Sequence, residues 1–111
     1  MKQKLDLPRP SINALLKLGQ DISEARRRRR ITVALMAERA RISPITVKQI
    51  ELGNPSTSIG GYASVLFVLG MTERLRDIAD ISHDLTGQRL AEESLPKRIY
   101  YKRTRKKDGQ K

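Results

Sequence analysis

Thr46, Lys48 and Gln49 are three polar residues within four positions of a short, otherwise apolar stretch. If this stretch is helical, Val47 and Ile50 lie on one face and the three polar side chains lie on the other. A hydroxyl, an ammonium group and a carboxamide together offer hydrogen-bond donors and acceptors. Because the chain has a formal net charge of +11, the expected partner of this polar face is the major groove of DNA.

A helix with clear start and stop signals is needed to present these residues. Ser43 is a preferred cap, and Pro44 suits the first helical position because no acceptor exists there for a backbone N–H. The helix is predicted to run to about Leu52 and to stop at Gly53.

A second short helix is predicted just before the first. It spans residues 33–40, and Thr32 is expected to cap it. The apolar residues predicted to close the two helices on each other are Met36, Ala37, Ala40, Ile42, Val47 and Ile50.

The segment before these helices reads as an arm followed by a long helix. Residues 1–10 hold two prolines and alternating charges, and Ser11 is expected to cap a helix that runs to about Arg29. The run 26–30 consists of five arginines, which point in directions about 100° apart on a helix and so cannot all face one ligand. We expect two or three of them to neutralise phosphate; the alternative is a solvated helix end that complements the helix dipole.

Two further helices are expected after the motif, each with its own cap. Ser58 is predicted to cap residues 59–69, and Thr72 to cap a helix that runs to about Asp80. Glycines at 60–61 suggest a close approach by another backbone or a ligand. The residues expected to face inward are Ile59, Tyr62, Ala63, Val65, Leu66 and Leu69 in the fourth helix, and Leu75, Ile78 and Ala79 in the fifth.

The pattern loosens beyond Ser82, where residues 84–93 are predicted to form a last short helix before Pro96. The expected organisation is an N-terminal arm over 1–10, a helix-turn-helix domain over 11–81, and an extension with a basic tail over 82–111.

Charge and composition narrow the classes of function. Residues 1–57 carry a net +7, residues 58–96 a net −3 and residues 97–111 a net +7, which suits a polyanion for the outer segments. The alternative is a basic protein without a nucleic-acid role. The absence of cysteine excludes disulfides and thiolate metal sites. No apolar run approaches the roughly 20 residues of a membrane span, and the N-terminus lacks a signal-peptide core, so we expect a cytoplasmic protein.

The segment LMAERARISPITVKQIELGNPSTSIGGYASVLFVLGM resembles the helix-turn-helix of lambda Cro/repressor-like (Xre-type) regulators, which often read LAexAGiSxxTlsxiExG. The likeness covers about residues 15–80. It implies a compact, all-α, five-helix DNA-binding domain with a flexible basic C-terminal tail. One departure is Arg41, where the family usually has glycine in the turn; a left-handed conformation there costs roughly 1–2 kcal/mol. The matching residues are Leu35, Met36, Ala37, Glu38, Ala40, Ile42, Ser43, Thr46, Val47, Ile50, Glu51 and Gly53.

The resemblance also implies roles for individual residues in binding double-stranded operator DNA. Thr46 and Gln49 would face base edges, where glutamine can pair with adenine, while Lys48 would reach guanine or phosphate and Ile45 a thymine methyl. Glu51 would pair with Arg26; the alternative is a solvated glutamate. The predicted DNA-binding residues are Arg28, Arg29, Arg30, Thr32, Val33, Ser43, Pro44, Ile45, Thr46, Lys48, Gln49, Asn54, Ser56 and Ser58.

Regulators of this type usually bind as homodimers on pseudo-palindromic sites, and the apolar residues Leu75, Ile78, Ile81, Leu85 and Leu90 are the expected contacts. A looser likeness, in the proline-bearing arm, the arginine-rich first helix, the SIGGYASVLFVLG helix and the LPKR tail, is to HipB-type antitoxins. It implies a HipA-like kinase toxin as a second partner and repression of a shared promoter. A free-standing phage-type regulator is the alternative.

Other classes of function have weaker support in the sequence. We expect no enzymatic activity and no cofactor, because there is no phosphate-binding loop of the GxxxxGK type. His83 with Asp77, Asp80 and Asp84 could hold a metal ion, but a solvated helix face is the preferred interpretation. A basic RNA-binding protein that stacks bases on the tyrosines at 100–101 is the remaining rival.

Overall fold

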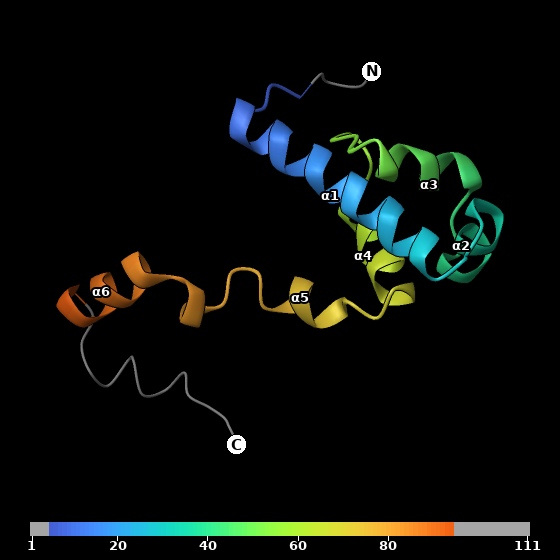
Figure 1. Ribbon diagram of the computed structural model, residues 1–111. Helices are drawn as coiled ribbons and strands as arrows, with labels where there is room; N and C mark the ends of the chain where they lie inside the picture. Colours follow the sequence, from blue (N-terminus) through green and yellow to red (C-terminus); the bar gives the residue numbers. More distant parts are fainter. Residues whose placement is uncertain (1–4, 95–111) are drawn as a thin grey trace. The chain divides into compact units, whose positions relative to one another are not determined.

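The computed structural model describes residues 5–94, and within that range every regular element is a helix. The all-α prediction is therefore confirmed. The chain divides into two compact units, Met1–Leu75 and Arg76–Lys111. The elements, shown in Figure 1, are α1 (Arg9–Arg28), α2 (Val33–Ala40), α3 (Pro44–Glu51), α4 (Ile59–Val68), α5 (Thr72–Arg76), the 3-10 helix η1 (Ile81–His83) and α6 (Leu85–Ser94).

The core of the first unit lies where α1, α2, α3 and α4 meet. Five of the six residues predicted to close α2 on α3 are buried, and Ile42 is partly buried against them. Ile59 is the main exception in α4, because it sits in the first turn and is 75% exposed. The buried apolar residues are Ile22, Ala25, Ile31, Met36, Ala37, Ala40, Val47, Ile50, Tyr62, Val65, Leu66 and Leu69.

Three hydroxyl groups cap the N-termini of α2, α3 and α4, as predicted. Thr32 Oγ1 accepts from the Leu35 N–H at 3.0 Å, and Ser43 Oγ and Ser58 Oγ each accept at 3.1 Å from the N–H three residues on. Each cap satisfies a backbone donor that has no partner inside its helix. The start of every helix around the motif is thus fixed by its own sequence.

The start of α1 was predicted incorrectly. The helix begins at Arg9 after Pro8, and no side chain caps it, so Ser11 lies inside the helix. Prolines fit here because backbone N–H groups in a first turn have no helical acceptor to lose. The predicted arm over residues 1–10 is therefore partly helical, and residues 1–4 of that arm lie outside the described residues.

Two glycines allow α1 to meet the end of α3 backbone to backbone. A Cβ on Gly19 would lie 2.6–2.7 Å from the carbonyl oxygens of Ile50 and Glu51 and from the nitrogen of Gly53. Gly53 has a φ of +73°, and a Cβ there would lie 2.5 Å from the carbonyl oxygen of Leu15. By contrast, no backbone atom comes close at the glycines of α4: the nearest atom to a Cβ is Ser58 Oγ at 3.7 Å for Gly60 and Ile50 Cδ1 at 3.4 Å for Gly61.

The helix predicted from Thr72 to about Asp80 is shorter than expected. It ends at Arg76, Thr72 is its first residue, and Ile78 and Ala79 are exposed where the sequence placed them inside. The Asp80 carboxylate accepts from the backbone N–H and hydroxyl of Ser82. These hydrogen bonds cap the start of η1 and compete with a continuation of α5.

The second unit is described over residues 76–94. Asp84 accepts from the Gly87 N–H at the start of α6, which confirms a short last helix close to the predicted range. α6 packs against η1. No side chain within 76–94 is buried, although Ile78, Ile81, Leu85 and Leu90 are all large and apolar.

None of the helices in the described part of the chain combines the length and apolar character needed to cross a membrane.

Candidate nucleic-acid interface

The outer face of α3 presents the polar residues that the sequence singled out. Val47 and Ile50 are fully buried on the inner face, whereas Ile45 is 71% exposed and Lys48 is also exposed. Gln49 is partly exposed one turn after Ile45, so the two side chains lie on the same side of the helix. The structure therefore brings an apolar group, a cation and a carboxamide together on one accessible surface.

The first turn of α3 is held by hydrogen bonds between its own residues. Ser43 Oγ lies 2.9 Å from Thr46 Oγ1 and also accepts from the Thr46 N–H. Ser43 and Pro44 are exposed, and Thr46 is partly exposed. This pairing fixes the Thr46 hydroxyl beside Ser43, where either oxygen can still bond to a ligand.

The loop after α3 contacts the helix through Asn54. Asn54 Nδ2 donates to Gln49 Oε1 at 2.6 Å, and Asn54 Oδ1 accepts from the Ser56 N–H at 2.8 Å. The Tyr62 hydroxyl on α4 donates to the Asn54 carbonyl oxygen at 2.9 Å. The sequence predicted that Asn54 lies in a loop that contacts the DNA backbone. The structure adds that Asn54 is hydrogen-bonded to Gln49 on α3.

Arg26 and Glu51 form the predicted ion pair between α1 and α3. Arg26 Nε and Nη2 donate to the two Glu51 carboxylate oxygens at 2.6 and 3.1 Å, and Arg26 Nη1 donates to the Ile31 carbonyl oxygen at 2.8 Å. The side chains are 11% and 12% exposed. Hydrogen bonding to Glu51 raises the pKa of the Arg26 guanidinium, and burial opposes this effect. The pair thus fixes the end of α3 and keeps the Glu51 carboxylate turned toward α1.

The arginine run at the end of α1 divides into different environments. Arg26 is buried, and Arg29 donates to the carbonyl oxygens of Ala25 at 2.9 Å and Leu69 at 3.1 Å. Arg28 and Arg30 are exposed. Arg30 also has a φ of +55°, a left-handed conformation that is uncommon outside glycine. Arg28 and Arg30, together with the exposed Arg27, are therefore the more available cations, whereas Arg29, although exposed, ties α1 to the end of α4.

The remaining predicted site residues occupy helix starts or the loop. Thr32 is exposed and Val33 is half-buried against the core. Ser56 and Ser58 are exposed, and Ser58 caps α4. Backbone N–H groups at capped helix starts such as those of α2 and α4 are suited to hold a phosphate.

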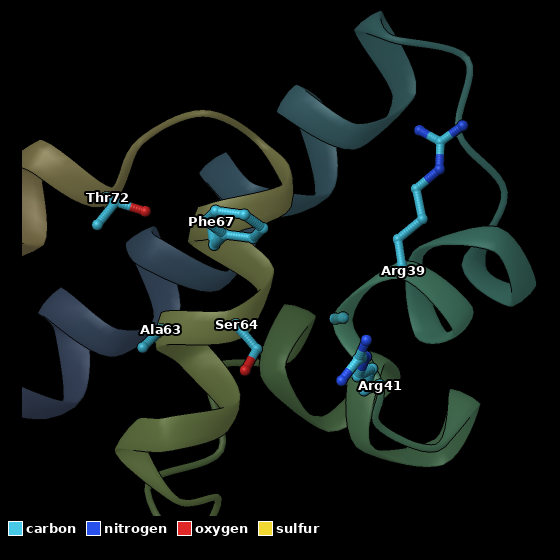
Figure 2. A pocket seen from close by; sticks show the side chains of 7 residues that line it. Arg39, Arg41, Ala63, Ser64, Phe67 and Thr72 are labelled. Atoms are coloured by element: carbon cyan, nitrogen blue, oxygen red, sulfur yellow. The ribbon is translucent and has the colours of Figure 1, made fainter.

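A second surface feature, which the sequence did not predict, is an open groove between the end of α2 and α4. Its volume is about 460 Å³. Figure 2 shows Ala63, Ser64 and Phe67 on α4, with Arg39 and Arg41 on the α2 side. Phe67 is 70% exposed, and Arg41 has a φ of +60°, the left-handed conformation expected for this turn position. The only sign of this groove in the sequence is Phe67, a large apolar residue in a strongly apolar helix. Its lining residues are Arg39, Ala40, Arg41, Ala63, Ser64, Phe67 and Thr72.

The acidic residues near His83 bond to their neighbours in the chain: the Asp77 carboxylate accepts from Arg76, and the Asp84 carboxylate accepts from the Gly87 N–H. Asp80 accepts from Ser82, and these hydrogen bonds lower the pKa of the Asp80 carboxyl below its ordinary value. Among the described residues, no three His, Asp or Glu side chains come together in a way that could hold a metal ion.

Comparison with known proteins returned no matching family model, no matching curated protein and no matching solved structure. The function of the chain is therefore inferred from its own residues and their geometry.

Proposed function

We propose that this protein is a sequence-specific DNA-binding transcriptional repressor that inserts α3 into the major groove. The observation that carries the proposal is the division of α3 into two faces. Val47 and Ile50 lock the helix into the core, while Ile45, Lys48 and Gln49 remain accessible. A short, rigidly held helix with hydrogen-bonding groups on its outer face is the usual means of reading base edges.

Charge supports the same proposal. Residues 5–75 carry eleven Lys/Arg and six Asp/Glu, a net +5, and Glu51 is paired with Arg26 at the end of α3. Positive charge on this unit favours the phosphate backbone, and capped helix starts offer further N–H donors. We infer a lambda-repressor-like domain, in which α2 and α3 form the helix-turn-helix.

The protein is proposed to act as a homodimer on a pseudo-palindromic operator. Residues 76–94 expose four large apolar side chains: Ile78, Ile81, Leu85 and Leu90. Exposed apolar side chains in a small unit suit a protein–protein contact. Dimeric regulators of this type read half-sites about 34 Å apart, one helical turn of DNA.

The biological role is proposed to be that of an antitoxin that represses the promoter it shares with a HipA-like kinase toxin in the cytoplasm. A free-standing phage-type regulator would use the same α3 surface without the toxin. A toxin encoded next to this chain and co-purifying with it supports the first role, and a chain that purifies alone supports the second. No catalytic step by this protein is proposed. The alternative of RNA binding depends on the tyrosines at 100–101 and on the basic tail over 97–111, which lie outside the described residues.

The direct test is selection of bound duplexes from a random DNA library, followed by titration of the selected site. Lys48→Ala is expected to weaken binding to that site by about tenfold, in line with roughly 1–3 kcal/mol for a good base contact. Lys17→Ala is the charge-matched control, because Lys17 is exposed on α1 and pairs with Asp21. Equal binding to random duplex, or tighter binding to single-stranded RNA than to any duplex, would reject the proposal.

A further inference from the structure

A chain of hydrogen bonds fixes the orientation of two carboxamides at the end of α3. The Ser56 backbone N–H can only donate, so the Asn54 atom that it contacts at 2.8 Å must be the oxygen, Oδ1. The opposite atom, Nδ2, then faces Gln49 and can only donate. Its partner at 2.6 Å must be the acceptor Oε1 of Gln49. Gln49 Nε2 is consequently the end directed away from Asn54.

Asn54 itself is held firmly enough to impose this orientation. Its backbone N–H donates to the Gln49 carbonyl oxygen at 3.0 Å, and its own carbonyl oxygen accepts from the Tyr62 hydroxyl at 2.9 Å and the Thr57 N–H at 3.3 Å. The loop is therefore anchored to both α3 and α4. A rotation of the Asn54 side chain would break the bonds to Ser56 and Gln49 together.

We propose that Asn54 is a positioning residue that makes Gln49 read guanine. Resting on the proposed DNA-binding function, this inference assigns the polarity of one base contact. Nε2 carries two N–H donors, and within the described residues it has no hydrogen-bond partner of its own. Guanine offers two adjacent acceptors, N7 and O6, at its major-groove edge.

The usual expectation for glutamine is adenine, and the Asn54 contact argues against it here. Pairing with adenine requires Oε1 to accept from the adenine amino group while Nε2 donates to N7. In this protein Oε1 already accepts from Asn54 at 2.6 Å, so it faces the loop. The two donors of Nε2 are left as the outward-facing groups.

Asn54→Asp is the decisive variant. One oxygen of the new carboxylate can still accept from the Ser56 N–H, and the other can accept from Gln49 only if its carboxamide turns over. Oε1 would then face outward as an acceptor. The base preference at one position should shift from guanine to a base with an amino group, adenine or cytosine, by about tenfold in relative affinity.

Three companion variants separate this effect from general weakening. Gln49→Glu removes both donors and should abolish the guanine preference at the same position. Asn54→Ala should leave the Gln49 carboxamide free to turn and narrow the preference between guanine and adenine. Gln20→Ala is the control, because it removes an exposed carboxamide on α1 that bonds to Glu24 and is not part of the proposed interface, so it should leave base preference unchanged.

Each outcome bears on a different claim. A wild-type protein with no sequence preference would reject DNA recognition itself. A sequence-specific wild type that prefers adenine at the Gln49-dependent position, or an Asn54→Asp variant with unchanged preference there, would overturn the role of Asn54 alone.

A readout without DNA comes from the side-chain amide NMR signals: the Asn54 amide protons should shift in Gln49→Ala, and unchanged signals would also overturn the proposal. Circular dichroism spectra would verify that each variant is folded.

Discussion

Arg26 on α1 holds Glu51 at the end of α3 by two nitrogen–oxygen contacts of 2.6 and 3.1 Å, while its third nitrogen bonds to the carbonyl oxygen of Ile31. One guanidinium group thereby joins three parts of the chain: α1, the connection to α2, and the end of α3. The position of α3, the proposed DNA-recognition helix, thus depends on a side chain of α1, which lies outside the helix-turn-helix.

Glu51→Gln should destabilise the protein by about 3 kcal/mol, because removing one partner of a largely buried ion pair leaves the other charge without compensation. Urea unfolding measures this loss. Arg26→Lys keeps the positive charge but loses the two-pronged geometry, so it should also be destabilising. In a double-mutant cycle with Arg26→Met and Glu51→Leu, the double variant should lose less than the sum of the single losses. Additive losses would show that the two side chains do not interact.

Gly19→Ala should destabilise the first unit by about 1–3 kcal/mol, the usual cost of adding a methyl group where neighbouring atoms cannot move. The neighbours here are backbone atoms of Ile50, Glu51 and Gly53 at 2.6–2.7 Å. Gly60→Ala is the control, because a Cβ there meets no atom closer than 3.7 Å. Thermal unfolding of both variants is the measurement, and equal midpoints would contradict the close α1–α3 contact.

Arg41→Gly should stabilise the protein by up to about 1.5 kcal/mol. Relief of the left-handed conformation is worth roughly 1–2 kcal/mol, and the added freedom of glycine in the unfolded chain offsets about 0.5–1 kcal/mol of it. Arg41→Ala removes the same charge but keeps the Cβ, so it should give no gain. The comparison of the two midpoints in urea decides whether backbone strain or charge is responsible.

Arg29 should differ from Arg28 and Arg30 when each is replaced by alanine. Arg29→Ala removes two bonds to backbone carbonyls, including one to Leu69, and should cost about 1 kcal/mol of stability. Arg28→Ala and Arg30→Ala should leave stability nearly unchanged. Each should reduce the slope of log affinity against log salt by about 0.9 for every phosphate that the arginine had neutralised. Unchanged slopes would remove these two residues from the DNA interface.

Tyr62 should make stability depend on pH in the alkaline range. Burial raises the pKa of the Tyr62 phenol, so the folded state favours the neutral form more than the unfolded state does. Its contribution is complete below the unfolded pKa of about 10 and is lost as pH rises through the higher folded value. The stability difference between wild type and Tyr62→Phe should therefore shrink above about pH 10, as measured by urea unfolding across that range. A constant difference would show that the phenol does not titrate with unfolding.

The sequence predicted those features that depend on nearby residues. Thr32, Ser43 and Ser58 each bond to a backbone N–H three positions ahead, so their caps could be recognised without knowing the fold. The helical spacing of apolar residues likewise predicted correctly that Val47 and Ile50 lie in the core. The left-handed conformation of Arg41 was expected from the resemblance, because a turn of that type needs it.

Features that depend on distant residues or on competing local bonds were missed. The bond from Arg29 to Leu69 spans 40 positions, and nothing in the arginine run distinguishes Arg29 from its neighbours. Apolar periodicity predicted that Ile78 points inward, but periodicity cannot show which surface would cover it. The contact of Asn54 with Gln49 depends on loop geometry that composition does not encode.

Residues 76–94 bury no side chain, and this sets how the two units of the chain should respond to a protease. Opening a segment that buries little exposes little new surface and costs little free energy, so its peptide bonds reach the cleavable state often. The unit ending at Leu75 must break its core before its bonds are accessible. Limited digestion should therefore cut within residues 76–94 first and leave a fragment that still contains α1 to α4. The half-life of that fragment reports the stability of the proposed DNA-binding domain alone.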